Sequence, residues 1–210
     1  MKSSRLLLIV LFSSVYIGLN AQVFVGGTVR FSTLNDEHNG TTADKYSNYN
    51  FNLNPRIGKF LSEKTAIGLA LDISLTGNKR ENTAETSSKS SSFGISPFLR
   101  YYALRWNKVS VFGQGNIGLA LINSSDKSGG VTTDEPKGTK IYISFYPGLS
   151  YDIRENISLE TTINILSLAY NYTSTKDGST KYKNSNFNLG GGPGNIISFD
   201  AFSIGAIYKF

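Results

Sequence analysis

Few side chains in this sequence could carry chemistry of their own. The chain of 210 residues has a single histidine, His38, which directly follows Asp36 and Glu37 in a polar segment. Three adjacent ligands without a fixed scaffold are typical of a solvated charge cluster and not of a metal site. A hydrolytic serine needs a positioned base, usually histidine, and no such pair can be assigned. We therefore predict that the protein is not an enzyme and holds no metal or cofactor.

Composition and spacing exclude several other kinds of site. The glycine run from Gly190 to Gly194 lacks the Lys-Ser/Thr pair and the helix of a phosphate-binding loop, so we interpret it as a flexible hinge. The absence of cysteine excludes disulfides, thiolate metal sites and a lipoprotein-type anchor. The formal net charge is +6, but the sequence contains no run of basic residues interleaved with aromatic ones. This argues against a nucleic-acid partner.

The remaining candidates are charged residues that share a face with small and polar residues inside alternating apolar segments. They are Arg30, Arg56, Asp72, Arg100, Asp152 and Glu160. Both signs are present, and a lone charge in a protein interior is very costly. We therefore expect an interior Arg–carboxylate network that fixes packing. Its centre is predicted to hold Arg56, Arg100, Asp72 and Glu160.

Eight segments that are predicted to be strands must position these residues. Abundant Gly, Ser, Thr, Asn, Tyr and Phe favour strands and polar turns over helices. The predicted strands are Gln22–Leu34, Ser47–Phe60, Lys64–Thr76, Ser91–Leu104, Lys108–Ile122, Thr139–Asp152, Asn156–Asn171 and Ile197–Phe210.

The predicted connections between these strands alternate in length. The long polar ones are Asn35–Tyr46, Gly77–Ser90, Asn123–Gly138 and Tyr172–Ile196. The short ones are Leu61-Ser62-Glu63, Arg105-Trp106-Asn107 and Ile153-Arg154-Glu155. Eight antiparallel strands with all long connections at one end have the layout of an outer-membrane β-barrel, with short periplasmic turns and long external loops.

The beginning of the chain has the three-part layout of a secretory signal peptide. Lys2 and Arg5 precede the mostly apolar 14-residue stretch from Leu6 to Leu19, and a small residue follows at Ala21. The stretch is shorter than the ~20 residues that a membrane-spanning helix needs. We therefore predict that residues 1–21 are cleaved and that residues 22–210 form one domain. If that domain is membrane-embedded, only a closed barrel satisfies its backbone.

The alternation within the strands indicates which face meets lipid. From Ile67 to Leu75 every second residue is a branched apolar one, and the residues between are Gly, Ala, Asp and Ser. Small residues suit the narrow lumen of an eight-stranded barrel. The polar face also carries few charges for a surface exposed to water. We therefore expect the apolar face to point outward into lipid and the polar face to point inward.

Aromatic residues and prolines add two expectations. Two aromatic belts are expected where a barrel meets lipid headgroups. One lies near the short turns (Phe60, Tyr101, Trp106, Tyr151, Tyr208 and Phe210) and the other toward the long loops (Tyr49, Phe51, Phe93 and Tyr142). Pro55, Pro97 and Pro147 fall in mid-strand on the predicted lipid face, where a backbone donor is lost, so we expect bulges there.

The end of the chain resembles the C-terminal β-signal of outer-membrane proteins. Ser203, Gly205, Tyr208 and the terminal Phe210 match its polar, glycine and alternating aromatic positions. The phrases NPRIGKFLSEKTAIGLAL and SPFLRYYALRWNKVSVF are similar to hairpins of the small outer-membrane β-barrel family of the porin-like, OmpX/OmpW type. The resemblance implies an outer-membrane location in a Gram-negative cell envelope, contact with outer-membrane lipid, and the barrel-assembly machinery as partner during biogenesis.

The sequence leaves three functions open. The first is a structural or surface-interaction barrel with a lumen filled by polar side chains, whose long loops could meet an external ligand. The second is a narrow channel for ions or small solutes, suggested by the surplus of interior arginine. The third, a lipid-modifying enzyme, is disfavoured by the position of His38 in a polar loop.

Overall fold

The computed structural model describes residues 22–38, 44–81, 86–128, 131–134, 137–163, 168–177, 180–189 and 202–210. The predicted signal peptide and the glycine run at residues 190–194 lie outside this part of the chain. No helix within the described residues is long and apolar enough to cross a membrane.

The described chain consists of antiparallel strands joined by turns. The strands are β1 (Val23–His38), β2 (Asp44–Phe60), β3 (Thr65–Glu81), β4 (Thr86–Trp106), β5 (Val109–Ser128), β6 (Val131–Asp134), β7 (Gly138–Arg154), β8 (Ile157–Ile163), β9 (Leu168–Asp177), β10 (Thr180–Leu189) and β11 (Phe202–Lys209).

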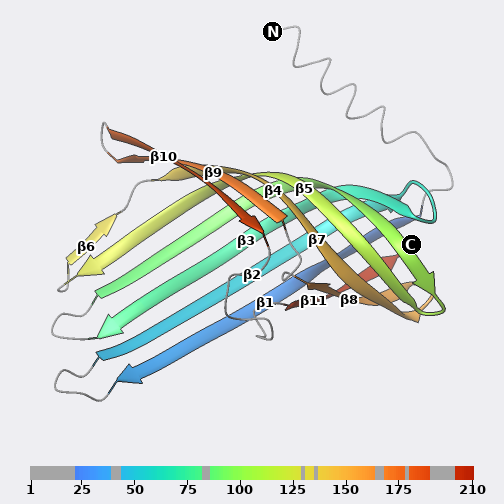
Figure 1. Cartoon of the computed structure of the whole chain (residues 1–210), viewed down its shortest axis with the longest axis horizontal. Helices are drawn as coiled ribbons and strands as arrows, with labels where there is room; N and C mark the ends of the chain where they lie inside the picture. Colours follow the sequence, from blue (N-terminus) through green and yellow to red (C-terminus); the bar gives the residue numbers. More distant parts are fainter. Residues whose placement is uncertain are drawn as a thin grey trace, which may run out of the picture.

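These strands form a closed barrel with eight positions in its wall (Figure 1). The first six positions are β1, β2, β3, β4, β5 and β7. Both β8 and β9 pair with successive parts of β7 and share the seventh position. The eighth holds β11, which pairs with β8, and β10, which pairs with β9. Pairing of β11 with β1 closes the wall, and β6 is a short arm on the external end of β5. The predicted eight-stranded barrel is thereby confirmed.

Burial follows the predicted alternation along the central strands. In β4 the even-numbered residues from Gly94 to Tyr102 are buried, whereas the odd-numbered ones are exposed. Exposed odd residues include Phe93, Ile95 and Leu99, each more than 40% exposed. The large apolar side chains therefore cover the outside of the barrel, which is the reverse of a water-soluble domain.

The wall extends well beyond the predicted strands at the end opposite the short turns. The predictions of long loops at Asn35–Tyr46, Gly77–Ser90 and Asn123–Gly138 were wrong for most of their lengths, because β1 to β5 extend into them and β6 lies within the third. Much of Tyr172–Ile196 is likewise strand, in β9 and β10. These segments are polar on both faces because water lies on both sides of a sheet outside the membrane. They therefore lack the alternation that reveals a strand.

Two of the three short turns are tighter than predicted, and the first is one residue longer. They lie at Leu61–Lys64, Asn107–Lys108 and Glu155–Asn156, so Arg105, Trp106 and Ile153 belong to strands. Asn107 has a φ of 54°, a left-handed conformation that asparagine tolerates better than most residues.

The bulges expected at the three prolines do not occur. The register of β2, β4 and β7 is unchanged across Pro55, Pro97 and Pro147, and two of them face a glycine, Gly27 or Gly113. A proline can lose one ladder bond without inserting a residue. The register shifts lie instead beside two short turns, at Tyr102/Leu104 and at Asp152/Arg154.

Candidate functional site

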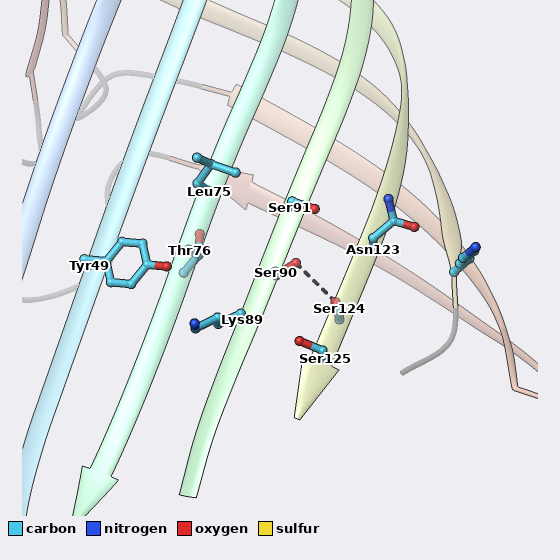
Figure 2. A pocket seen from close by; sticks show the side chains of 10 residues that line it. Tyr49, Leu75, Thr76, Lys89, Ser90, Ser91, Asn123, Ser124 and Ser125 are labelled. Carbon is cyan, nitrogen blue, oxygen red and sulfur yellow. Dashed lines mark hydrogen bonds between the residues drawn. The ribbon is translucent and has the colours of Figure 1, made fainter. Parts of the chain in front are cut away.

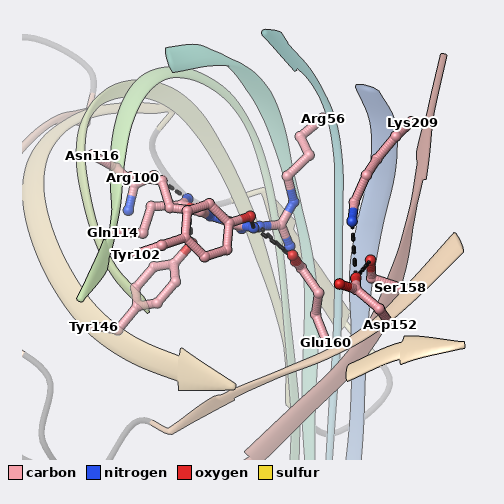
Figure 3. Close-up of polar contacts among 10 residues, drawn as sticks. All are labelled: Arg56, Arg100, Tyr102, Gln114, Asn116, Tyr146, Asp152, Ser158, Glu160 and Lys209. Carbon is pink, nitrogen blue, oxygen red and sulfur yellow. Dashed lines mark hydrogen bonds and ion pairs between the residues drawn. The ribbon is translucent and has the colours of Figure 1, made fainter. Parts of the chain in front are cut away.

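Two arginines and one glutamate meet inside the barrel, nearer to its short-turn end than to its other end (Figure 3). Arg56 comes from β2, Arg100 from β4 and Glu160 from β8, and all three side chains are 0% exposed. The large arginines have room because the residues paired with them on β3 are the small Ala70 and Ala66.

The two arginines contact Glu160 unequally. Arg100 donates through Nη1 to a carboxylate oxygen of Glu160 in a close ion pair. The Nη1 atom of Arg56 lies 3.7 Å from the other carboxylate oxygen. Two positive charges and one negative charge therefore share an enclosed space. Arg100 forms the closer ion pair with Glu160.

Gln114 of β5 completes this group of residues. Its Oε1 accepts hydrogen bonds from Nε and Nη2 of Arg100, at 2.9 and 2.7 Å, and from Nη1 of Arg56 at 3.2 Å. Its amide nitrogen donates to the hydroxyl of Tyr146 and to Oδ1 of Asn116. Arg56, Arg100, Gln114 and Glu160 are called the central charged cluster below.

A layer of aromatic rings lies between the central charged cluster and the short turns. It consists of Phe24, Phe60, Phe98, Tyr102 and Phe112, with ring centroids of neighbouring pairs 5.3 to 6.3 Å apart. Arg100 connects the two layers, since its guanidinium carbon is 4.0 Å from the centroid of the Phe112 ring. This aromatic layer was not predicted, although the parity of Phe24, Phe98 and Phe112 along their strands could have revealed it.

Asp72 does not join the arginines as predicted. It lies on the external side of the central charged cluster and accepts hydrogen bonds from Asn54, Ser96 and Tyr142. No ion pair between Asp72 and an arginine is present among the described residues. Neutral hydroxyl and amide groups therefore donate to this carboxylate. The expected single network is divided into one group around Asp72 and another around Glu160.

Asp152 forms a third group at the short-turn end of the lumen. It accepts hydrogen bonds from Ser158 and from Nζ of Lys209, the latter at 2.8 Å (Figure 3). Lys209 was not among the predicted site residues because it lies between the aromatic residues of the β-signal. Its inward position follows from the alternation of β11, in which Ile207 is also buried.

Two hollows occupy the lumen on the external side of the central charged cluster. The smaller, of about 160 Å³, is lined by Arg30, Asp72 and Tyr146 among others. The larger, of about 370 Å³, includes Asn52, Lys140 and Tyr142 in its lining. Arg30 thus faces the lumen but lies apart from the ion pairs around Glu160.

The predicted aromatic belts are present in part. Trp106 and Phe210 at the short-turn end and Phe93 toward the other end are exposed on the outside of the barrel. The assignments of Phe60 and Tyr142 to these belts were wrong. Both side chains point into the lumen, because their even positions place them on the inner face of β2 and β7.

The candidate β-signal lies along the seam that closes the barrel. Ser203 is buried, while Tyr208 and Phe210 are exposed with their rings in edge contact at 4.9 Å. A Cβ on Gly205 would meet the Gly27 carbonyl oxygen at 2.0 Å, so β1 and β11 approach too closely here for any other residue. His38 ends β1, but its side chain lies outside the described part of the structure.

The described residues contain no group of three or more His, Cys, Asp or Glu side chains that could hold a metal ion. Comparison of sequences finds no matching protein-family model and no matching curated protein.

Comparison of structures finds other outer-membrane barrels. A major outer membrane protein of Thermus thermophilus aligns with a TM-score of 0.52 and 12% identity, over 91% of this chain and 100% of that one. Neisserial surface protein A aligns with a TM-score of 0.42 and 18% identity, over 90% and 97% of the two chains. OprG of Pseudomonas aeruginosa aligns with a TM-score of 0.47 and 12% identity, over 90% and 95%. Together with the large apolar side chains exposed around the outside of the barrel, called the apolar belt below, the first of these likenesses shows that the chain has the fold of a small eight-stranded outer-membrane β-barrel.

Proposed function

We propose that this protein is a non-conducting outer-membrane barrel with a structural and surface-interaction role. The observation that carries the proposal is the filling of the lumen by two successive layers. Arg100, Glu160 and Gln114 of the central charged cluster are at most 3% exposed, and Phe24 and Phe112 of the aromatic layer are at most 1% exposed. An eight-stranded barrel has room for little beyond its own side chains.

The distribution of space in the lumen supports interaction at the external end. Both lumenal hollows described above lie on the external side of the central charged cluster. The strands β1 to β5 also extend past the apolar belt, which supports a rigid polar surface outside the membrane. In this proposal, external molecules bind to the extended strands and to the external opening of the lumen. The periplasmic end of the lumen stays closed.

A narrow channel is the second candidate, because the central charged cluster carries one more positive charge than negative. In a channel these arginines would have to move aside to admit an ion. The close Arg100–Glu160 pair and the three hydrogen bonds to Gln114 oppose such a movement.

Catalysis is not part of the proposal. An assay of lipid deacylation, with His38→Ala as the control variant, tests that point.

Conductance in planar lipid bilayers distinguishes the first two candidates. We expect no single-channel steps from the mature protein. We also expect Arg100→Ala to lower the melting temperature strongly without creating conductance, because the aromatic layer still closes the lumen. Stable steps in the wild-type protein, or unchanged stability of Arg100→Ala together with a new conductance, would overturn the proposal.

A further inference from the structure

The outer surface of β2 to β5 changes from apolar to basic toward the external end. Directly paired residues of neighbouring strands share a face, so the register gives whole rows of outward side chains. One row contains Leu53, Ile73, Phe93 and Leu121. Two rows further out the paired residues are Tyr49, Gly77, Lys89 and Ser125, and the next row contains Ser47, Lys79, Ser87 and Lys127.

The lysines lie at the depth of lipid headgroups. Lys89 precedes the lipid-facing Phe93 by four residues on β4, and Lys137 precedes the lipid-facing Ile141 by four residues. Four residues span roughly 13 Å along a strand. With a strand tilt of about 40°, this corresponds to roughly 10 Å along the membrane normal. Both ammonium groups are therefore expected just outside the hydrocarbon region.

A hollow of about 510 Å³ lies at this level (Figure 2). Its lining includes Lys89 and Lys137, the polar Ser91 and Asn123, and the apolar side chain of Leu75 with the ring of Tyr49. Ammonium, hydroxyl and amide groups are the donors that a phosphate accepts from, and an apolar floor suits the first part of an acyl chain. We call this hollow the outer groove.

The charge of the surrounding surface also favours an anion. Lys45, Lys79 and Lys127 occupy the strands beside the outer groove, on the same outward face. The nearby acid with a described side chain on that face is Glu81, which accepts a hydrogen bond from Lys79. That hydrogen bond lowers the pKa of Glu81, and this one carboxylate faces two lysines, Lys79 and Lys45.

We propose that the outer groove binds the phosphate of a phosphorylated glycolipid in the external leaflet of the outer membrane. Lys89 and Lys137 would hold the phosphate, Ser91 and Asn123 would donate hydrogen bonds, and the lipid chains would continue along the apolar belt below. The inference depends on the outer-membrane location and the surface role of the extended strands, and not on whether the lumen conducts.

Binding of lipid A to the refolded mature protein in a neutral detergent tests this site. Native mass spectrometry would compare lipid A with its dephosphorylated form for the wild-type protein, for the double variant K89Q/K137Q, and for the matched control K64Q/K108Q. The control removes two exposed lysines from the short turns at the opposite end. All three proteins would first be required to show the same heat-modifiable migration.

We expect K89Q/K137Q to bind lipid A about 10- to 30-fold more weakly, since each lysine near an anionic surface contributes on the order of a fivefold factor. The control and the wild type should bind alike, and dephosphorylated lipid should bind all three proteins equally weakly. Unchanged affinity of K89Q/K137Q, or an equal loss with both lipids, would overturn the inference. So would displacement of lipid A by inorganic phosphate at the same concentration. Bilayer conductance of the same preparations reports separately on the proposed function.

Discussion

Arg100 and Arg56 lie side by side in the central charged cluster, but their surroundings differ. Arg100 donates to Glu160, to Gln114 and to the hydroxyl of Tyr102. Arg56 donates to Gln114, and its Nε and Nη2 have no hydrogen-bond partner within the described protein. Because the two guanidinium groups repel each other, Arg56 contributes less to stability than its burial suggests.

This difference gives a prediction for two matched variants. Arg100→Met should lower the free energy of unfolding by about 3–5 kcal/mol, because it deprives Glu160 of its close partner. Arg56→Met should cost roughly 1 kcal/mol or less, because the Arg100–Glu160 pair remains and a like charge is removed. Urea unfolding in detergent micelles, followed by heat-modifiable migration, measures both. Equal losses of stability would contradict the assigned roles.

At the scale of the strands, the sequence pattern predicts the structure inside the membrane but not outside it. Within the membrane, alternation gave the course of each strand and the inward face of Arg56, Arg100 and Glu160. Outside the membrane it gave no signal, because a solvated strand needs no apolar face. The separation of Asp72 from the arginines also could not be predicted, since it depends on the register that places Tyr142 and Ser96 beside it.

Close contact between strands gives a prediction at the scale of elements. A Cβ on Gly68 would lie 2.2 Å from the Ile57 carbonyl oxygen and 2.5 Å from the Phe98 ring, whereas one on Gly115 would have its nearest neighbour at 4.0 Å. Gly68→Ala should therefore destabilise the barrel by about 1–3 kcal/mol, as overpacking does. Gly115→Ala should leave the thermal midpoint nearly unchanged. Equal thermal midpoints of the two variants would contradict this prediction.

The last strand, β11, allows assembly to be separated from stability. Phe210, which directly follows β11, is 70% exposed, and its ring lies in edge contact with the ring of Tyr208. We propose that the assembly machinery reads this end. Phe210→Ala is therefore expected to refold in detergent with wild-type stability, yet to accumulate in the outer membrane of cells at a reduced level. Pulse labelling with cell fractionation measures the rate of accumulation. Wild-type accumulation would show that Phe210 is an ordinary lipid-facing residue.

At the scale of the molecule, the described strands form a barrel that carries large apolar side chains on the outer face of its membrane segment and buries the Arg100–Glu160 ion pair in its lumen. The lumen is filled by the central charged cluster and the aromatic layer, and it holds hollows on the external side. The fold could be predicted from the sequence because the outer apolar face, the short turns and the chain end all indicated it. The aromatic layer and the extended strands required the structure, since they depend on how residues of different strands meet.

Contact between the outer face and lipid is the claim on which the account depends. Fluorescence quenching by brominated lipids tests it directly, because Trp106 is the single tryptophan of the chain and is 84% exposed. A second reporter would be Leu119→Trp in a Trp106→Phe background, at a position that is 50% exposed in mid-belt. We predict that bromines deep in the acyl chains quench the tryptophan at position 119 most strongly and that shallow bromines quench Trp106. Absence of quenching at both positions, with a protein that stays soluble without detergent, would contradict the account.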